Sequence, residues 1–98
     1  MTEIFWTSRA DADLDAIFNF AARNSEDYAL LLVQRILGAV KRLKDFPLSG
    51  RSVPEFERPD IREVILVPYR IVYRVLDQEV HILIVQHAAK QLPDDLPI

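Results

Sequence analysis

The chain of 98 residues is long enough for one compact domain and too short for two, because a chain of this length buries roughly 60 to 70% of its unfolded surface on folding. Half of the residues are hydrophobic and 28% are charged, which predicts one folded domain over residues 1–98 and is unlike the composition of a disordered tail. The formal net charge of −3 argues against a broad, non-specific grip on nucleic-acid phosphates, although an acidic chain can still carry a local basic patch.

The chain has no cysteine, which excludes disulfides, thiolate nucleophiles and the usual structural zinc sites. Its two histidines, His81 and His87, have no HExxH or comparable spacing, so we expect no metal and no other cofactor. No apolar stretch approaches the roughly 18 residues that span a bilayer, and Arg9, Asp11 and Asp13 interrupt the region where a signal peptide would lie. We therefore expect a cytoplasmic protein without membrane contact.

The first predicted element is a short β-strand from Thr2 to Thr7, because Ile4–Trp6 is a β-branched and aromatic run. A helix should follow to about Arg23, with Ser8 as its N-cap and Asp11 near the positive end of the helix dipole. Its apolar residues recur at helical spacing and form one stripe: Ala10, Leu14, Ile17, Phe18 and Ala21.

A second helix is predicted from about Glu26 to Phe46, after a stop and restart at Asn24-Ser25. A helical hairpin results. The stripe expected to face the core consists of Ala29, Leu32, Val33, Ile36, Val40 and Leu43.

Leu31 breaks the pattern of the second helix, because it falls on the face that its polar neighbours Asp27 and Gln34 place in solvent. Leu30 lies at the border of the same face. Scattered surface leucines need no explanation; alternatively, these leucines form a partner surface on which Gly38 permits close approach.

The segment Pro47–Asp60 is predicted to be a loop, because it contains three prolines and Gly50. A structureless connection of this length in a small domain is often functional. Three strands follow, and the short connections between them require antiparallel pairing. They are expected at Ile61–Val67, Tyr69–Leu76 and Val80–Gln86. The segment from His87 onward should be irregular and mobile at its end.

The predicted fold class is α+β: an N-terminal strand, a two-helix hairpin and a three-stranded antiparallel sheet, with the hairpin on one sheet face and the other face open. Alternation along the strands decides which side chains lie on the open face. The more apolar set, with Ile82 and Ile84, should face the helices. The open face then carries Arg70, Arg74, His81 and His87, joined by Arg62 through its alternation with Val64 and Leu66.

Two interpretations of this basic face remain open. The face can be an ordinary solvated surface on which some arginines pair with Glu55, Glu57 or Glu63. It can also be a functional surface, and His87 at a strand end then has the better geometry for proton exchange near neutral pH.

The chain resembles toxins of the RelE/ParE superfamily, and the ParE type in particular. The resemblance extends over nearly the whole chain and depends on the order and spacing of several short motifs. These are Pro47-Leu48-Ser49-Gly50-Arg51, Val53-Pro54-Glu55, Arg62-Glu63, Tyr69-Arg70-Ile71-Val72-Tyr73-Arg74 and His87, preceded by Trp6, the helix start Ala12–Asp15 and the helix exit Leu43–Pro47.

The resemblance implies a β-α-α-β-β-β fold and a toxin of a type II toxin–antitoxin system. It also implies a ParD-like antitoxin partner with a ribbon-helix-helix DNA-binding head and a tail that wraps the toxin. The toxin would form a hetero-oligomer with this antitoxin and reach operator DNA only through it. The antitoxin is expected to contact Leu30, Leu31 and Gly38.

Members of the superfamily that resemble ParE poison DNA gyrase, and members that resemble RelE cleave messenger RNA on the ribosome. In an RNA-cleaving protein the candidate catalytic residues would be Arg51, Arg62, Arg70 and His87. The tyrosine often found beside such a histidine is absent, because Ala88 stands there, and lysine-rich helices are also missing.

The sequence therefore favours a gyrase-directed toxin that acts by binding and has no firm catalytic residue. Its expected target contacts are Arg51, Arg62, Arg70, Arg74 and His87. The alternatives are ribosome-dependent RNA cleavage and a non-toxic module that only binds the antitoxin.

Overall fold

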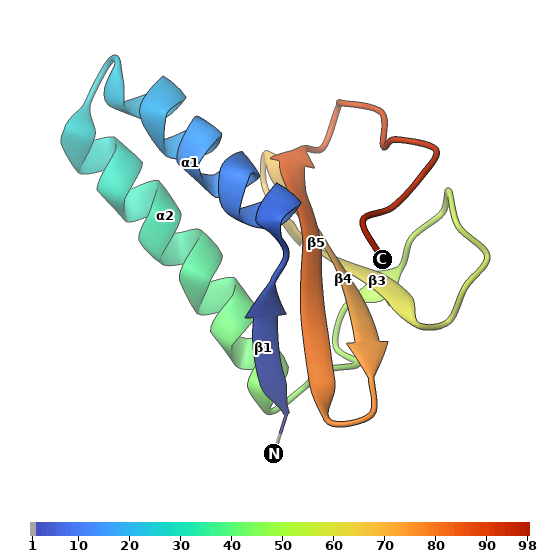
Figure 1. Ribbon diagram of the computed structural model, residues 1–98. Helices are drawn as coiled ribbons and strands as arrows, with labels where there is room; N and C mark the ends of the chain where they lie inside the picture. The colour runs from blue at the N-terminus through green and yellow to red at the C-terminus, as the bar shows by residue number, and fades with distance from the viewer. Residues whose placement is uncertain (1) are drawn as a thin grey trace.

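The computed structural model describes residues 2–98, and its elements follow the predicted order of strand, helical hairpin and further strands (Figure 1). The α+β fold class is confirmed. In chain order the elements are β1 (Glu3–Trp6), α1 (Ser8–Ala22), α2 (Glu26–Lys41), a 3₁₀ turn (Arg42–Lys44), β2 (Arg51–Ser52), β3 (Ile61–Leu66), β4 (Tyr69–Leu76) and β5 (Glu79–His87).

The sheet has five strands in the order β1-β5-β4-β3-β2 and is mixed. β3, β4 and β5 pair antiparallel, as their short connections predict. β1 adds to the other side of β5 as a parallel strand, with Glu3 opposite Glu79 and Trp6 opposite Ile82. β2 is a two-residue strand antiparallel to β3 and lies inside the segment that the sequence predicts to be a loop. The sequence predicts the N-terminal strand itself, but neither its pairing with β5 nor the strand β2 was predicted.

The first helix begins one residue earlier than its predicted cap implies. Thr7, not Ser8, is the N-cap: its backbone is extended and its Oγ1 accepts a hydrogen bond from Ala10 N at 3.1 Å. Thr7 N also donates to Ile82 O, so this residue ends β1 and caps α1 at once. The predicted restart is confirmed at Ser25, whose Oγ accepts from Tyr28 N. The second helix gives way to the 3₁₀ turn after Lys41, before the predicted end at Phe46.

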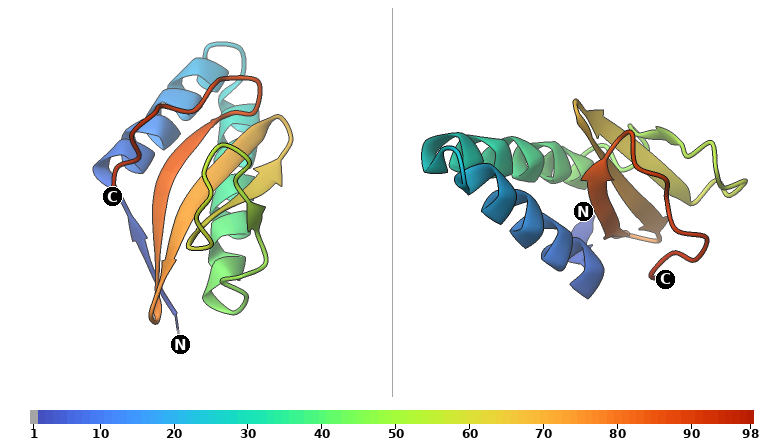
Figure 2. Two further views of the ribbon diagram at one scale, coloured as in Figure 1. Left: turned by 90° about the vertical axis from the view of Figure 1, so that its right-hand side faces the viewer. Right: turned by 90° about the horizontal axis from the view of Figure 1, so that it is seen from above.

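Both helices lie on one face of the sheet, and the main hydrophobic core fills the space between them (Figure 2). The apolar stripe predicted for the second helix is buried there, except that Val33 is only half-buried and Ala39 joins it. From the strands, this core receives the fully buried Ile71, Tyr73, Val80 and Ile82 and the nearly buried Val85.

A β-bulge in β5 reverses the predicted alternation in the second half of that strand. Val72 pairs with Ile84 and Tyr73 with Ile82, so Leu83 is an extra residue without a partner in the register. Beyond the bulge, Ile84 lies on the face away from the helices, and Val85 packs in the helix-side core. The prediction that Ile82 and Ile84 share a face is therefore wrong. Because the extra residue shifts the alternation by one position, His87 lies on the helix side and not on the far face.

The sheet face away from the helices is not open. It carries a second hydrophobic cluster made of Val53, Ile61, Val72, Leu83, Ile84 and Leu92, with Phe56 and Leu96 packed against it. Two of these side chains come from the irregular segment after β5, and two come from the connection between β2 and β3. That C-terminal segment crosses the far side of the sheet (Figures 1 and 2), where Leu92 is only 6% exposed. It is irregular, as predicted, but it is anchored by these leucines.

Neither described helix has the length and apolar character that crossing a membrane would require.

Candidate functional site

Arg70, predicted to lie on an open sheet face, is buried in a network of carboxylates. It does lie on the face away from the helices, but its side chain is only 8% exposed. Its Nη1 and Nη2 groups donate to the two carboxylate oxygens of Glu55 at 2.9 and 3.0 Å. Its Nε donates to Oε1 of Glu63 at 2.8 Å. The hydrogen bonds to Glu55 are the main reason that the pKa of Arg70 is raised, and they hold the pKa of Glu55 below its usual value.

Glu63 connects Arg70 to Arg51. The Glu63 side chain is 0% exposed, and its second oxygen, Oε2, accepts a hydrogen bond from Nε of Arg51 at 2.7 Å. The Arg51 side chain is 62% exposed, so its guanidinium edge remains in water. The pairing of arginines with Glu55 and Glu63, which the sequence left open as one interpretation, is thus the arrangement in the structure.

Arg74 and His81 lie on the same far face, at the other end of the strands. Arg74 Nε is 3.1 Å from Oδ2 of Asp60, and its side chain is 29% exposed. Asp60 also pairs with Arg58, whose hydrogen bond is the largest cause of the lowered pKa of Asp60. His81 stands opposite Arg74 in the strand register and lies 2.9 Å from a Glu79 carboxylate oxygen. Arg74 and His81 therefore each have an acidic neighbour.

Arg62 is not on the far face, contrary to the prediction. It stands opposite Tyr73 in the register, and Tyr73 belongs to the helix-side core. Residues two apart in a strand share a face, so Arg62 accompanies Val64 and Leu66, which pack against the same core. Its Nη1 donates to the carbonyl oxygen of Gly50 at 2.9 Å, and its Nε is buried without a hydrogen-bond partner within residues 2–98.

Tyr73 ties the connection before β2 to the sheet. Its hydroxyl donates to Pro47 O at 2.8 Å and accepts from Gly50 N at 2.9 Å. Burial raises the pKa of this hydroxyl, so it stays protonated at neutral pH and serves as a structural donor. Two hydrogen bonds of Gly50, one from Arg62 and one to Tyr73, thus hold this connection against the sheet at one end of β3.

His87 lies at the end of β5, opposite Tyr69, with the two ring centroids 6.0 Å apart. Its Nδ1 accepts a hydrogen bond from Ala89 N at 3.1 Å, so a neutral ring carries its proton on Nε2. Burial raises the pKa of the Tyr69 hydroxyl, which favours its protonated form. This corner contains an imidazole and a phenol on the helix side, whereas Arg70 lies on the opposite side of the sheet.

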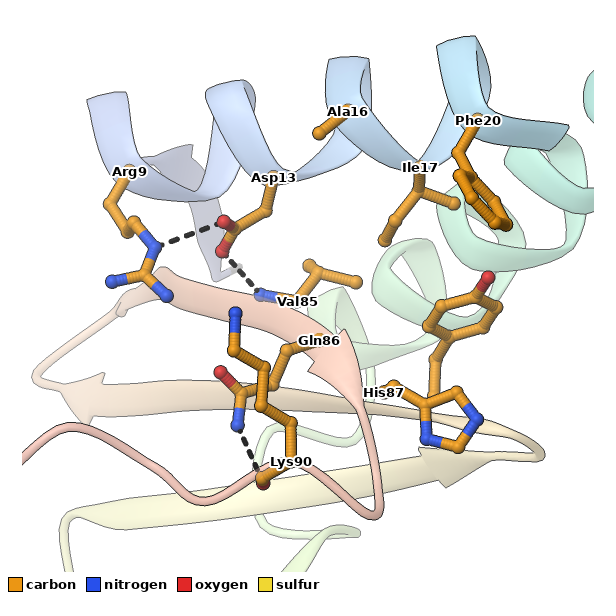
Figure 3. Close-up of a pocket in the computed structure, with 10 residues that line it drawn as sticks. Arg9, Asp13, Ala16, Ile17, Phe20, Val85, Gln86, His87 and Lys90 are labelled. Carbon is orange, nitrogen blue, oxygen red and sulfur yellow. Dashed lines mark hydrogen bonds and ion pairs between the residues drawn. The ribbon is translucent and has the colours of Figure 1, made fainter. Parts of the chain in front are cut away.

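A hollow of about 430 Å³ adjoins His87, between α1 and the turn after β5 (Figure 3). Arg9 and Asp13 enter it from α1, and Gln86 and Lys90 enter it from the strand end and the turn. Asp13 links α1 to β5, because its Oδ2 accepts a hydrogen bond from Val85 N at 3.0 Å. Its Oδ1 lies 2.9 Å from Nε of Arg9, on the same helix. The sequence analysis missed this grouping; the spacing of Arg9 and Asp13 by four residues in a helix was the available signal.

The predicted arginine and histidine constellation is thus distributed over separate environments. Glu63 brings Arg51 and Arg70 together; Arg74 is bound to Asp60, Arg62 belongs to the helix side, and His87 belongs to the hollow beside α1. Within residues 2–98, no group of three or more potential metal-ligating side chains is found.

The second helix presents the apolar surface that its sequence pattern indicates. Leu30 and Leu31 are 52% and 57% exposed, and a Cβ atom built on Gly38 would meet nothing within 4 Å. Leu37, which the sequence analysis did not single out, is also exposed on this helix.

Comparisons with known proteins agree on one family. A family model described as "ParE toxin of type II toxin-antitoxin system, parDE" matches residues 4–92. The chain is 36% identical to "Toxin RelE2" of Caulobacter vibrioides over 92% of this chain and 99% of that protein. It is 39% identical to the protein Y4kP of Sinorhizobium fredii over 95% of both. A solved structure described as "Chromosomal ParDE TA system from P. aeruginosa" matches with a TM-score of 0.75 and 33% identity, over 89% of this chain and 96% of that one.

Proposed function

Since this chain belongs to the family of ParE toxins of type II toxin–antitoxin systems, we propose that it inhibits DNA gyrase in the cytoplasm and is neutralised by a ParD-like antitoxin. The inhibition proceeds by binding: the toxin holds gyrase in the state in which the DNA is cleaved. The antitoxin carries the ribbon-helix-helix head, so contact with operator DNA is indirect.

The observation that carries this proposal is that the residues predicted for RNA cleavage, Arg51, Arg62, Arg70 and His87, do not converge. Cleavage requires a base for the 2′-hydroxyl, free cations for the phosphorane and an acid for the leaving oxygen. Arg70 is occupied by Glu55 and Glu63, and His87 lies on the other side of the sheet from it. A buried cation that is neutralised by two carboxylates has little capacity left to stabilise a phosphorane.

Of the five residues expected to contact the target, three have side chains that can reach a macromolecule. Arg51 is the most exposed of the paired arginines, Arg74 is partly exposed, and His87 is exposed at the strand end. Arg62 and Arg70 support the loop and the sheet beneath them, and we assign them no direct contact.

A supercoiling assay with the purified chain and gyrase tests the proposal. The expected result is loss of supercoiling with accumulation of cleaved DNA, and Arg51→Ala should weaken inhibition by about tenfold if its exposed guanidinium makes a charged contact. Arg35→Ala is the matched control, because Arg35 is exposed on α2, away from these residues. Unchanged supercoiling and no cleaved complex would contradict the proposal.

Ribosome-dependent RNA cleavage remains a second candidate, and one observation favours it. The His87 imidazole lies beside a hollow that also receives Arg9 and Lys90, so a proton-transfer group and two cations share one corner. A translation extract separates the two functions: intact messenger RNA dismisses cleavage, whereas cleavage that His87→Ala abolishes would establish it. A chain that neither slows growth nor acts in either assay would be a module that only binds the antitoxin.

We also propose that the antitoxin contacts Leu30 and Leu31, with Gly38 allowing close approach. Exposed leucines on one helix suit a helix-in-groove or helix-on-helix contact. Leu31→Asp should weaken the complex by about tenfold or more, since a buried contact would receive an unpaired charge. Lys44→Asp is the control, because Lys44 is exposed in the 3₁₀ turn beyond the end of α2 and outside this surface. Equal affinity of Leu31→Asp and wild type, measured by titration calorimetry, would remove this surface from consideration.

A further inference from the structure

Arg51 in β2 is exposed, yet one edge of its guanidinium group is held. Its Nε donates to Oε2 of Glu63 at 2.7 Å, whereas neither of its Nη groups donates a hydrogen bond within residues 2–98. Because the side chain is 62% exposed, the edge formed by the two Nη groups lies in solvent. This edge can donate to both oxygens of one anion at the same time.

The carboxylate that holds Arg51 is itself fixed from inside the protein. The Glu63 side chain is 0% exposed, so it cannot follow Arg51 into solvent. Its other oxygen, Oε1, accepts a hydrogen bond from Nε of Arg70 at 2.8 Å, and Arg70 also donates to both carboxylate oxygens of Glu55. The orientation of the exposed Arg51 guanidinium is therefore set by a buried network beneath it.

Stability alone does not require a carboxylate beneath Arg51. Buried ion pairs such as Glu63 with Arg70 can often be replaced by apolar side chains of similar volume with little loss of stability. An exposed arginine without an anchor moves among many rotamers and loses this freedom when it binds a partner. The anchor at Glu63 removes that entropic cost before a partner arrives.

We propose that Glu63 is a positioning residue, which holds Arg51 so that its two Nη groups form a fork for one carboxylate of a protein target. The inference deepens the proposed function and rests on it only in that the chain acts by binding a protein. The edge between the two Nη groups matches the spacing of the two carboxylate oxygens, so the contact is bidentate. Glu63 itself does not touch the target.

A carboxylate fits this fork better than the phosphates of a nucleic acid. In the network around Arg51, the two glutamates Glu55 and Glu63 balance the two arginines, which leaves no excess positive charge to attract a polyanion. The whole chain also has a net charge of −3. A single carboxylate, by contrast, needs only the free edge of one guanidinium group.

The functional test measures, in bacteria that express each variant, the amount of chain that halves the growth rate. Arg51→Lys keeps the positive charge but loses both the Nε anchor and the fork, so this amount should rise about tenfold. The double variant Arg70→Met with Glu63→Met removes the anchor without leaving a buried charge, so the same rise is expected while urea unfolding stays close to that of the wild type. Arg35→Lys is the matched control, because Arg35 is exposed on α2, away from Arg51.

A triple variant separates positioning from a purely structural role. If Glu63 acts through Arg51, adding Arg51→Ala to the double methionine variant should raise the required amount by less than about twofold, because the anchored contact is already lost. If the network acts only on folding, the two losses multiply.

NMR relaxation of the isotope-labelled full-length chain tests the positioning without any target. The order parameter of the Arg51 Nε–H bond should be about 0.85 in the wild type, as in rigid backbone, and below about 0.6 in the double methionine variant.

The inference is overturned if Arg51→Lys is as toxic as the wild type, if the losses in the triple variant multiply, or if the Arg51 Nε–H bond is mobile in the wild type. Binding of a fluorescent DNA duplex that Arg51→Ala abolishes would also overturn it, because the anion would then be a phosphate. Growth reports action on any target, so unchanged supercoiling together with the expected growth results would remove gyrase from the proposed function and leave this inference standing.

Discussion

Replacing Arg70 by alanine should destabilise the fold more than it affects any contact with a target. The substitution removes every hydrogen bond that Arg70 gives to Glu63 and leaves that carboxylate, whose side chain is 0% exposed, with Arg51 as its remaining cation. Removing one partner of a buried ion pair lowers the free energy of unfolding by about 3 to 5 kcal/mol, because the remaining charge stays uncompensated in the interior. Arg51 still compensates part of the charge, so we expect about 3 kcal/mol, at the lower end of that range.

Two further variants test whether the loss of stability in Arg70→Ala comes from leaving a charge unpaired in the interior. Arg74→Ala removes a pair in which both side chains are 29% exposed, and such a surface pair contributes only about 0 to 1 kcal/mol. Replacing Arg70 and Glu63 together by methionine leaves no buried charge, so the double variant should unfold within about 1 kcal/mol of the wild type.

Urea unfolding monitored by the single tryptophan, Trp6 in β1, and by circular dichroism measures these differences. A loss below about 1 kcal/mol in Arg70→Ala would refute the view that the network holds the sheet. So would a double methionine variant that is less stable than Arg70→Ala alone. A folded Arg70→Ala chain without toxicity would instead assign this arginine to the target contact.

Other substitutions probe the same part of the fold. The hydrogen bond from Arg70 lowers the pKa of Glu55, so this stabilisation is present above the ordinary pKa of Glu55 and is lost as the pH falls through the lowered value. Glu55→Gln should therefore flatten the drop in thermal midpoint that the wild type shows as the pH falls below 4.5. Gly50→Ala should cost about 3 kcal/mol in urea unfolding, because its Cβ would lie 2.5 Å from Tyr73 Oη and 2.7 Å from a backbone oxygen. Gly38→Ala meets open space inside a helix and should stabilise the chain by about 0.5 to 1 kcal/mol; a loss of stability there would contradict the exposed placement of this face.

The local elements could be predicted because their signals are local. The apolar stripe of the second helix and the short connections around Pro68 and Asp77 specify a helix and antiparallel strands without reference to the rest of the chain. The pairing of β1 with β5 joins residues far apart in sequence, and no pattern within either strand indicates the partner.

The bulge in β5 could not be predicted from alternation. Residues 82–85 are all apolar, so none of them marks which face is exposed, and an extra residue at Leu83 leaves no trace in the pattern. The error then carries over to His87, which was expected beside Arg70. The error at Arg62 has a different cause. Residues two apart in a strand share a face, so Arg62 should have been predicted on the helix side together with Val64 and Leu66, where the structure has it.

The burial of Arg70 depends on a loop that folds back. Glu55 is 15 positions earlier in the chain and comes from the connection between β2 and β3. The sequence offers the pairing as one possibility, but the choice of partner requires the second hydrophobic cluster, where Val53 is 1% exposed and holds this connection against the sheet.

The parallel pairing of β1 with β5 has a consequence during synthesis of the protein. The hydroxyl of Thr7 bonds to the carbonyl oxygen of Leu83, 76 positions further along, so the ribosome must deliver nearly the entire chain before this junction can close. Until then β1 has no neighbour in the sheet, because its pairing partner is β5. A ribosome that stalls before β5 therefore releases a chain that cannot assemble the surfaces on which a toxin depends.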